Sequence, residues 1–180
     1  MKATVLHSVA GGSKTEYMKF PQGDTSIRVV SVPVRHDTYK MPDGKKFYMA
    51  ESVPEGVTSK PAKTYFMWVI DRTDGVAKLL ECGSTIYAQL EALSTNPQYK
   101  FDDVPPYDIT VNRKGERTET TYALTPHRND TELTEAEKEM VSKLEPMEAY
   151  IARKKEWEMR EMGNANTMTI ETAEGETLPF

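Results

Sequence analysis

The sequence has little of what disulfides and metal sites require. It contains one cysteine, Cys82, and three histidines, His7, His36 and His127, which lie far apart in the chain. A lone cysteine cannot form an internal disulfide, and structural zinc needs three or four suitably spaced cysteine and histidine ligands. We therefore predict no metal site and expect a reducing, cytoplasmic setting.

Long apolar runs are also missing. No segment approaches the length of a membrane span, and the N-terminal residues lack the apolar stretch of a signal peptide. The short segment Gly83-Ser84-Thr85 lacks the further glycines and the lysine of a phosphate-binding loop. These absences argue against a membrane protein and against a nucleotide-hydrolysing enzyme.

Residues that could support catalysis are few. The carboxylate pairs Asp71/Asp74 and Asp102/Asp103 could hold magnesium in a nuclease, but aspartates in such positions are more typical of turns and solvated loops. Cys82 with His127 could be drawn as nucleophile and base, but no third group is placed to orient them. We predict that the protein is not an enzyme and needs no cofactor.

Basic residues become scarce toward the end of the chain. Residues 1–128 carry 17 lysines and arginines against 15 aspartates and glutamates, a net charge of +2. Residues 129–180 carry 6 against 13, a net charge of −7, which gives the overall −5. A mildly basic body with an acidic tail differs from a uniformly acidic protein, because the tail can compete for whatever the body binds.

The segment Thr64–Leu93 is the most informative about the fold. Tyr65–Ile70 is apolar, aromatic and β-branched, which favours a strand, and Val76–Leu80 returns as a second strand after a turn. The residues after Ser84 have apolar positions at the 3.6-residue period, which predicts a helix capped by Ser84. The core unit is therefore predicted to be strand, turn, strand and helix.

Further strands are predicted on both sides of this unit, over residues 26–34, 46–49, 107–113 and 118–125. Five or six strands with one inserted helix predict a mainly β fold, a small Greek-key barrel of the oligonucleotide-binding (OB) kind, rather than a doubly wound sheet. A capping box at Thr134 and Glu137 begins a helical extension. We predict a flexible arm over residues 1–19, the OB-fold domain over 20–128, the helical extension over 129–162 and a disordered acidic tail over 163–180.

The predicted body places positive charges beside aromatic rings. Proteins that bind single-stranded nucleic acid combine cations that follow the phosphates with rings on which bases stack. On Tyr65–Ile70, alternate side chains point to opposite faces, so each ring there is either core or a stacking platform. The candidate DNA-binding residues are Arg35, Tyr39, Lys45, Lys46, Tyr48, Lys63, Tyr65, Trp68, Arg72, Arg113, Lys114, Arg117 and Tyr122.

Several segments resemble, in order, the replication-type single-stranded DNA-binding proteins of tailed bacteriophages. They are Pro21–Val30, Thr64–Asp71, Lys78–Gly83 with Ile86-Tyr87, and Tyr107–Val111 with Thr121–Pro126. The resemblance covers about residues 20–126 and implies an OB-fold barrel that coats single-stranded DNA during phage replication, recombination and repair. It departs from those members that carry a zinc subdomain of cysteine and histidine, which this sequence lacks.

The C-terminal residues resemble the acidic tip of bacterial single-stranded DNA-binding proteins. The resemblance rests on Glu174, Glu176, Leu178, Pro179 and Phe180, and it implies that the tip recruits replication, recombination or repair proteins. A terminal ring can fill an apolar pocket while the carboxylates meet basic side chains. The alternative is a phage transcription or recombination accessory factor that acts mainly through protein–protein contacts, and the helical extension could also mediate self-association.

Overall fold

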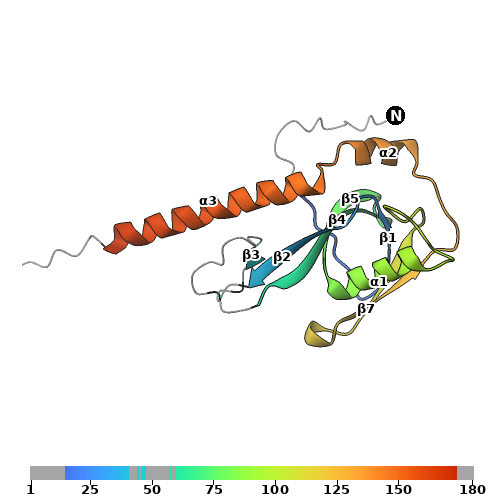
Figure 1. Cartoon of the computed structure of the whole chain (residues 1–180), viewed down its shortest axis with the longest axis horizontal. Helices are drawn as coiled ribbons and strands as arrows, with labels where there is room; N and C mark the ends of the chain where they lie inside the picture. The colour runs from blue at the N-terminus through green and yellow to red at the C-terminus, as the bar shows by residue number, and fades with distance from the viewer. Residues whose placement is uncertain (1–14, 41–43, 45, 48–56, 58–59, 174–180) are drawn as a thin grey trace, which may run out of the picture.

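The computed structural model describes residues 15–40, 44, 46–47, 57 and 60–173, and for residues 46–47 and 161–173 it describes the backbone alone. Figure 1 shows a β-sheet body from which one long helix projects. The elements in chain order are β1 (Gly23–Val29), β2 (Val34–Lys40), β3 (Lys46–Phe47), β4 (Ala62–Asp71), β5 (Val76–Gly83), α1 (Ser84–Thr95), β6 (Ile109–Lys114), the 3-10 helix η1 (Arg117–Glu119), β7 (Thr121–Pro126), α2 (Glu135–Ser142) and α3 (Met147–Ala173).

Strand β4 is the centre of the antiparallel sheet. Its first half pairs with β2 and its second half with β1, while β5 pairs along its other edge. Beyond β1 come β6 and then β7, which gives the order β5-β4-β1-β6-β7 for the body of the sheet. The mainly β prediction is confirmed. Among the described residues β5 does not pair with β7, so the sheet is open and not a closed barrel.

Helix α1 spans the opening between β5 and β7. The Gln89 side chain donates from Nε2 to the Tyr122 carbonyl at 2.9 Å and accepts from the Leu124 N–H at 3.0 Å. One amide side chain therefore occupies the position that a partner strand would take beside β7. The helix begins after Gly83, not Ser84, and its cap makes no side-chain hydrogen bond. Ser84 was predicted as the cap, but it is already the first helical residue.

The interior face of the sheet forms the first core cluster. Met67 and Val69 of β4 have no exposed surface, and they pack against apolar side chains from β1, β5, β6 and α1. The strand alternation of β4 sets which side chains point inward. Ile86 and Leu90 are the buried residues of α1, as its sequence period predicts.

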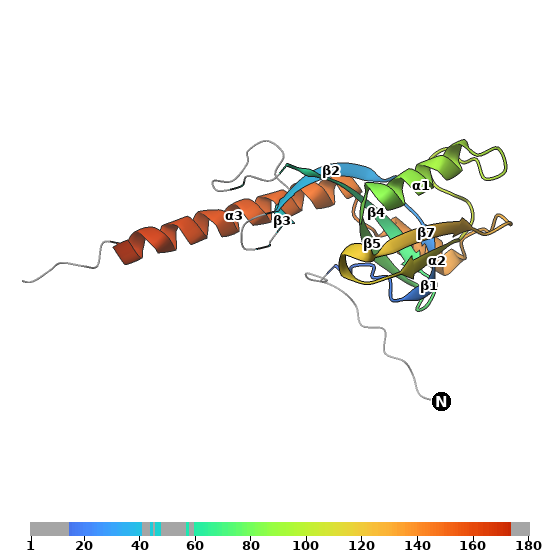
Figure 2. The same ribbon diagram turned by 90° about the horizontal axis from the view of Figure 1, so that it is seen from below.

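The opposite face of the sheet is also covered. Phe66 and Trp68 of β4 pack with Leu79 of β5 against α3, which contributes Met147, Tyr150 and Ile151. Figures 1 and 2 show α3 crossing this side of the sheet and then extending away from the body. Strand β4 therefore has no solvent-facing side over its second half, and the helical extension packs on the sheet along this second cluster.

Several predicted boundaries differ from the structure. The strand predicted over residues 26–34 is two strands, because β1 ends at Val29 and β2 begins at Val34 and runs to Lys40. The arm was predicted to run to residue 19, but Met18 is buried, and hydrogen bonds of 2.8 Å join its N–H to the Leu79 carbonyl and the Leu79 N–H to the Glu16 carbonyl. The helical extension was predicted to end at residue 162, but α3 continues to Ala173. Adding a residue to an existing helix costs far less free energy than starting one, so weak helix formers can prolong a helix.

No helix in the described part of the chain is long and apolar enough to cross a membrane.

Candidate nucleic-acid interface

Four of the predicted DNA-binding residues share one face of the β2–β4 pair. Arg35 lies opposite Tyr65, and Lys63 is two residues before Tyr65, so the strand period puts all three on the same side. Tyr39 follows on this side of β2. Arg35 and Lys63 are exposed, whereas the two tyrosines are half-buried. We call these four residues the β2–β4 face.

One ring of the β2–β4 face is stacked on a ring from α1. The Tyr65 ring lies parallel to the ring of Tyr87, with the centroids 3.7 Å apart and the planes 4° from parallel. Tyr87 comes from the start of α1 and was not among the predicted residues, although the resembling segments include it. The stack places a pre-oriented aromatic group beside Arg35, the cross-strand neighbour of Tyr65.

Arg35 is held by a neighbour that an anionic ligand can replace. Its Nε and Nη2 donate to the two carboxylate oxygens of Asp37 at 2.9 and 3.0 Å. These hydrogen bonds and the charge of Asp37 raise the pKa of Arg35, and the same contact lowers the pKa of Asp37. An exposed ion pair contributes little in water, so a phosphate can compete for the guanidinium at small cost.

The β6–β7 hairpin carries a second group of predicted residues. Lys114 and Arg117 are exposed near its tip, where Gly115 has φ +81° and a Cβ would collide with the Glu119 carbonyl. Only glycine fits this turn without strain. In both Figures 1 and 2 the hairpin tip, the start of α1 and the β2–β3–β4 strands lie on the same side of the sheet body.

The other two predicted residues of this hairpin are partly packed. Arg113 is half-buried and donates from Nη1 to the Phe20 carbonyl at 3.1 Å. The Tyr122 ring meets the ring of Phe20 edge to face, with the centroids 6.0 Å apart, and it packs on the interior cluster. These two residues support the hairpin and expose less surface to a ligand than Lys114 and Arg117 do.

The structure corrects the prediction that Trp68 is a stacking platform. Trp68 is only 8% exposed, its indole N–H donates to the Glu145 carbonyl at 2.8 Å, and its ring meets that of Tyr150 edge to face. The side of β4 that carries Trp68 is covered by a helix some 80 residues later in the chain. No local pattern around Trp68 indicates that cover.

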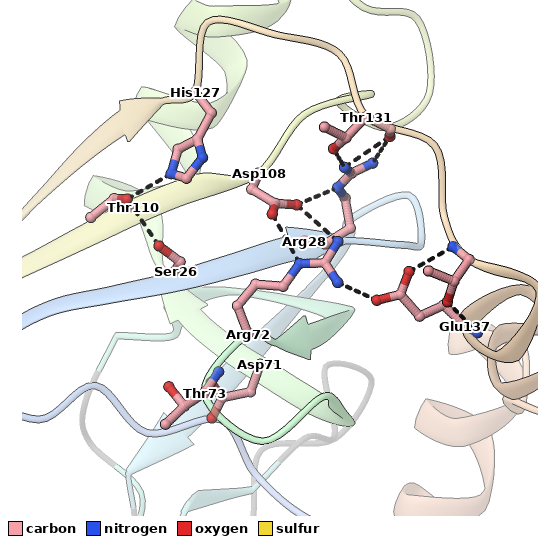
Figure 3. A network of polar contacts seen from close by, with 11 residues as sticks. Ser26, Arg28, Asp71, Arg72, Thr73, Asp108, Thr110, His127, Thr131 and Glu137 are labelled. Atoms are coloured by element: carbon pink, nitrogen blue, oxygen red, sulfur yellow. Dashed lines mark hydrogen bonds and ion pairs between the residues drawn. The ribbon is translucent and has the colours of Figure 1, made fainter.

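The structure also corrects the role predicted for Arg72, which lies in a polar network that joins the sheet to α2 (Figure 3). The guanidinium of Arg72 donates to both carboxylate oxygens of Asp108 at 3.0 Å and also pairs with Glu137. Arg28 binds the same carboxylate at 2.7 Å and donates to the Thr131 carbonyl. With these partners, Arg72 serves the attachment of α2 and is not available for phosphates.

The electrostatics of this network favour the charged forms. Burial alone would raise the pKa of Asp108, but hydrogen bonds from Arg72 and Arg28 outweigh it and lower that pKa. Burial likewise opposes the ionisation of Glu137, while the Thr134 N–H and Arg72 lower the pKa of Glu137. The capping box predicted at Thr134 is present and contributes to this shift. The network therefore depends on ionised carboxylates.

The environments of Asp71, Asp74, Cys82 and His127 do not favour the catalytic roles considered for them. The Nζ atom of Lys78 donates to Asp71 at 2.7 Å and to Asp74 at 2.6 Å, so an ammonium group occupies the position that a cation would need. Burial raises the pKa of Cys82 to about 12, which makes its thiol a poor nucleophile. The Nε2 atom of His127 lies 2.9 Å from the Thr110 hydroxyl.

Within the described residues no group of three histidine, cysteine, aspartate or glutamate side chains is placed to hold a metal. Several predicted residues lie outside those the structure describes. They are Lys45 and Tyr48 in the segment between β2 and β4, the side chain of Lys46, and the C-terminal Glu174, Glu176, Leu178, Pro179 and Phe180.

Comparison of the chain with protein-family models, with curated proteins and with solved structures finds no match. The functional argument therefore rests on the residues and their arrangement.

Proposed function

We propose that the protein binds single-stranded DNA without sequence preference. The observation that carries this proposal is the β2–β4 face, where exposed Arg35 and Lys63 flank the stacked rings of Tyr65 and Tyr87. Cations beside rings are the combination that binds a flexible strand, because phosphates recur along it and every base has a face that can stack.

The strand order supports an OB-fold framework. Strands β1 and β2 lie end to end along β4, so they can be counted as one bent first strand. The order β5-β4-β1-β6-β7, with a helix between β5 and β6, is then that of a partly open five-stranded OB fold. OB folds bind oligonucleotides with the loop between their first two strands and the loop between their last two. Here the β2–β4 face lies on the first two of these strands, and the β6–β7 hairpin contains the last two.

The mode of binding follows from the charges. Arg35, Lys63, Lys114 and Arg117 contact phosphates, and Arg35 exchanges Asp37 for a phosphate oxygen. A base stacks on Tyr65, and such a contact is worth about 1–3 kcal/mol. Phosphate contacts and base stacking carry little sequence information, so binding through these residues is expected to be nearly independent of sequence.

The test is the binding of a labelled oligo-dT and a matched duplex to the full chain at about 50 and 200 mM salt, followed by fluorescence anisotropy. We expect much tighter binding to the single strand and a steep loss of affinity with salt. Equal affinity for the duplex would contradict the proposal, as would no binding of either DNA at the lower salt.

The proposed biological role is protection of single strands in phage replication, recombination and repair, with the C-terminal tip recruiting partner proteins. It rests on the two sequence resemblances and on the net charge of −7 in residues 129–180. Removing residues 171–180 is expected to tighten DNA binding, since the acidic tail competes with phosphates, and to abolish partner binding. If removal leaves DNA affinity unchanged at low salt, the tail does not compete.

A further inference from the structure

The tryptophan available to a ligand is Trp157, not Trp68. Trp157 is 54% exposed on α3, whereas Trp68 is buried beneath the same helix. Tryptophan is highly buried on average in folded proteins, and this one presents more than half of its surface to solvent. Trp157 lines a groove of about 440 Å³ between α3 and the segment that precedes β1.

The groove combines rings with positive charge. Its remaining lining residues are Thr15, Tyr17, Tyr150, Arg153, Lys154, Glu156 and Arg160. Three of them are cationic and one is anionic, so the groove favours an anion. Arg153, Trp157 and Arg160 follow the i, i+4, i+7 spacing of one helix face, which puts the indole between two guanidinium groups.

The groove is pre-formed by contacts among its own residues. The hydroxyl groups of Tyr17 and Tyr150 are hydrogen-bonded at 2.8 Å, which ties the segment before β1 to α3. The guanidinium of Arg153 lies 5.3 Å from the centre of the Tyr150 ring. The ammonium of Lys154 lies 4.5 Å from the centre of the Trp157 ring, where it stands over one face of the indole. A site held in this way loses little freedom on binding.

The cations of the groove can turn to a new partner. Arg153 donates to Glu145 at 2.7 and 3.2 Å, but its side chain is 60% exposed, and an exposed pair of this kind is weak in water. A phosphate carries a full charge and can replace the carboxylate at small cost. Arg160, at the far end of the groove, is exposed as well.

We propose that this groove is a second contact site for single-stranded nucleic acid, in which a base stacks on Trp157 and phosphates meet Arg153 and Arg160. The inference rests on the proposed function, because it extends the path of the same ligand. The groove lies on the α3 side of the sheet and the β2–β4 face lies on the other, so the bound strand passes around the molecule from one to the other. An acidic peptide is the competing occupant, but a flat ring open to solvent between cations matches a nucleotide chain better than an extended peptide.

The first measurement uses tryptophan fluorescence of the full chain during titration with an oligo-dT of about 20 nucleotides. Oligo-dT is expected to quench the tryptophan fluorescence of the parent protein. The Trp157→Phe variant keeps Trp68 as its tryptophan, and most of the quenching is expected to be lost in it. Trp157→Ala is expected to weaken binding by about fivefold or more, and Phe at the same position to restore much of the affinity, since it can still stack. The matched control is Met159→Ala, because Met159 is 57% exposed on the same helix and does not line the groove.

The outcomes separate this inference from the proposed function. If Trp157→Ala binds oligo-dT as tightly as the parent while a double variant of Arg35 and Lys63 binds weakly, the groove is not a DNA contact and the proposed function stands. If the parent protein binds no oligo-dT, the proposed function and this inference are both wrong. If a peptide of residues 171–180 changes Trp157 fluorescence and oligo-dT does not, the groove is a peptide site and the inference is overturned.

Discussion

Over its second half, strand β4 is buried on its two faces by different elements. Met67 and Val69 on the interior face are enclosed by neighbouring strands and by α1, elements that lie within the same continuous body. Phe66 and Trp68 on the outer face are enclosed by α3, which follows the last strand by about twenty residues. The interior face belongs to the body formed by the sheet and α1, and the outer face is where the helices α2 and α3, here called the helical arm, attach to that body.

This difference indicates two levels of stability. The interior cluster is larger and draws on β1, β4, β5, β6 and β7. The helical arm is held by the smaller outer cluster, the Trp68–Glu145 hydrogen bond and the contact of Glu137 on α2 with Arg72. Regions with fewer buried contacts open at lower free energy than the core does. We therefore expect the helical arm of α2 and α3 to detach from the sheet under conditions in which the body stays folded.

The largest expected effect is at the interior face. Met67→Ala leaves a cavity among fully buried side chains, and such changes lower the free energy of unfolding by about 2–5 kcal/mol. The measurement is urea denaturation followed by circular dichroism. Met159→Ala, at an exposed position, is the control. A loss for Met67→Ala no larger than that of the control would show that the interior cluster is not the core.

The next largest loss of stability is expected in the polar network between the body and α2. Asp108→Asn removes the charge that Arg28 and Arg72 share, and the Arg28 side chain is only 4% exposed. Leaving a buried charge without its partner costs about 3 kcal/mol. The measurement compares the free energies of unfolding of this variant and of Asp102→Asn, which is the control because Asp102 is exposed in a loop. Equal stability of the two variants would mean that the network contributes nothing.

A smaller effect is expected at the outer face. Ile151→Ala removes apolar contact between α3 and the sheet, at a cost of about 2 kcal/mol at a position near the edge of its cluster. The loss should appear as faster amide hydrogen exchange in α2 and α3, with the exchange of β1, β4 and β6 unchanged. Uniformly faster exchange over all strands would show that arm and body unfold as one unit.

The smallest expected effect is on how much stability the protein loses at low pH. The pKa values of Asp108 and Glu137 are lowered in the folded protein, so their contribution to stability is complete above the unfolded values near pH 4. It is lost as the pH falls through the lower folded values. Glu137→Gln should therefore lose less stability than the parent between about pH 5 and 2. Parallel pH profiles of unfolding temperature for the two proteins would contradict this.

The sequence predicted the elements better than their surroundings. The hairpin of β4 and β5, helix α1 and the capping box at Thr134 depend on local patterns, and the structure contains all three. The sequence also placed Arg35, Lys63 and Tyr65 among the binding candidates, and strand pairing brings them to one face.

The remaining differences come from contacts between distant segments. Trp68 and Arg72 were predicted to bind DNA because their local sequence is aromatic and basic, but α3 and α2 engage them. Trp157 lies in a highly charged segment, and its i, i+4, i+7 spacing with Arg153 and Arg160 is a signal that the sequence itself contains. An amphipathic helix shows that it has a face to pack, but the sequence does not say on which side of the sheet.

The most direct test of the account compares two double variants for oligo-dT affinity over a range of salt. Arg35→Ala with Lys63→Ala alters the β2–β4 face, and Lys138→Ala with Lys143→Ala removes the same charge from exposed, ion-paired positions on and just after α2. We predict that the first variant binds more weakly and that its salt slope falls by about 1.4, since each lost phosphate contact on a single strand removes about 0.7. The second variant should keep the affinity and slope of the parent. Equal slopes for the two variants would contradict the claim that the β2–β4 face holds the DNA.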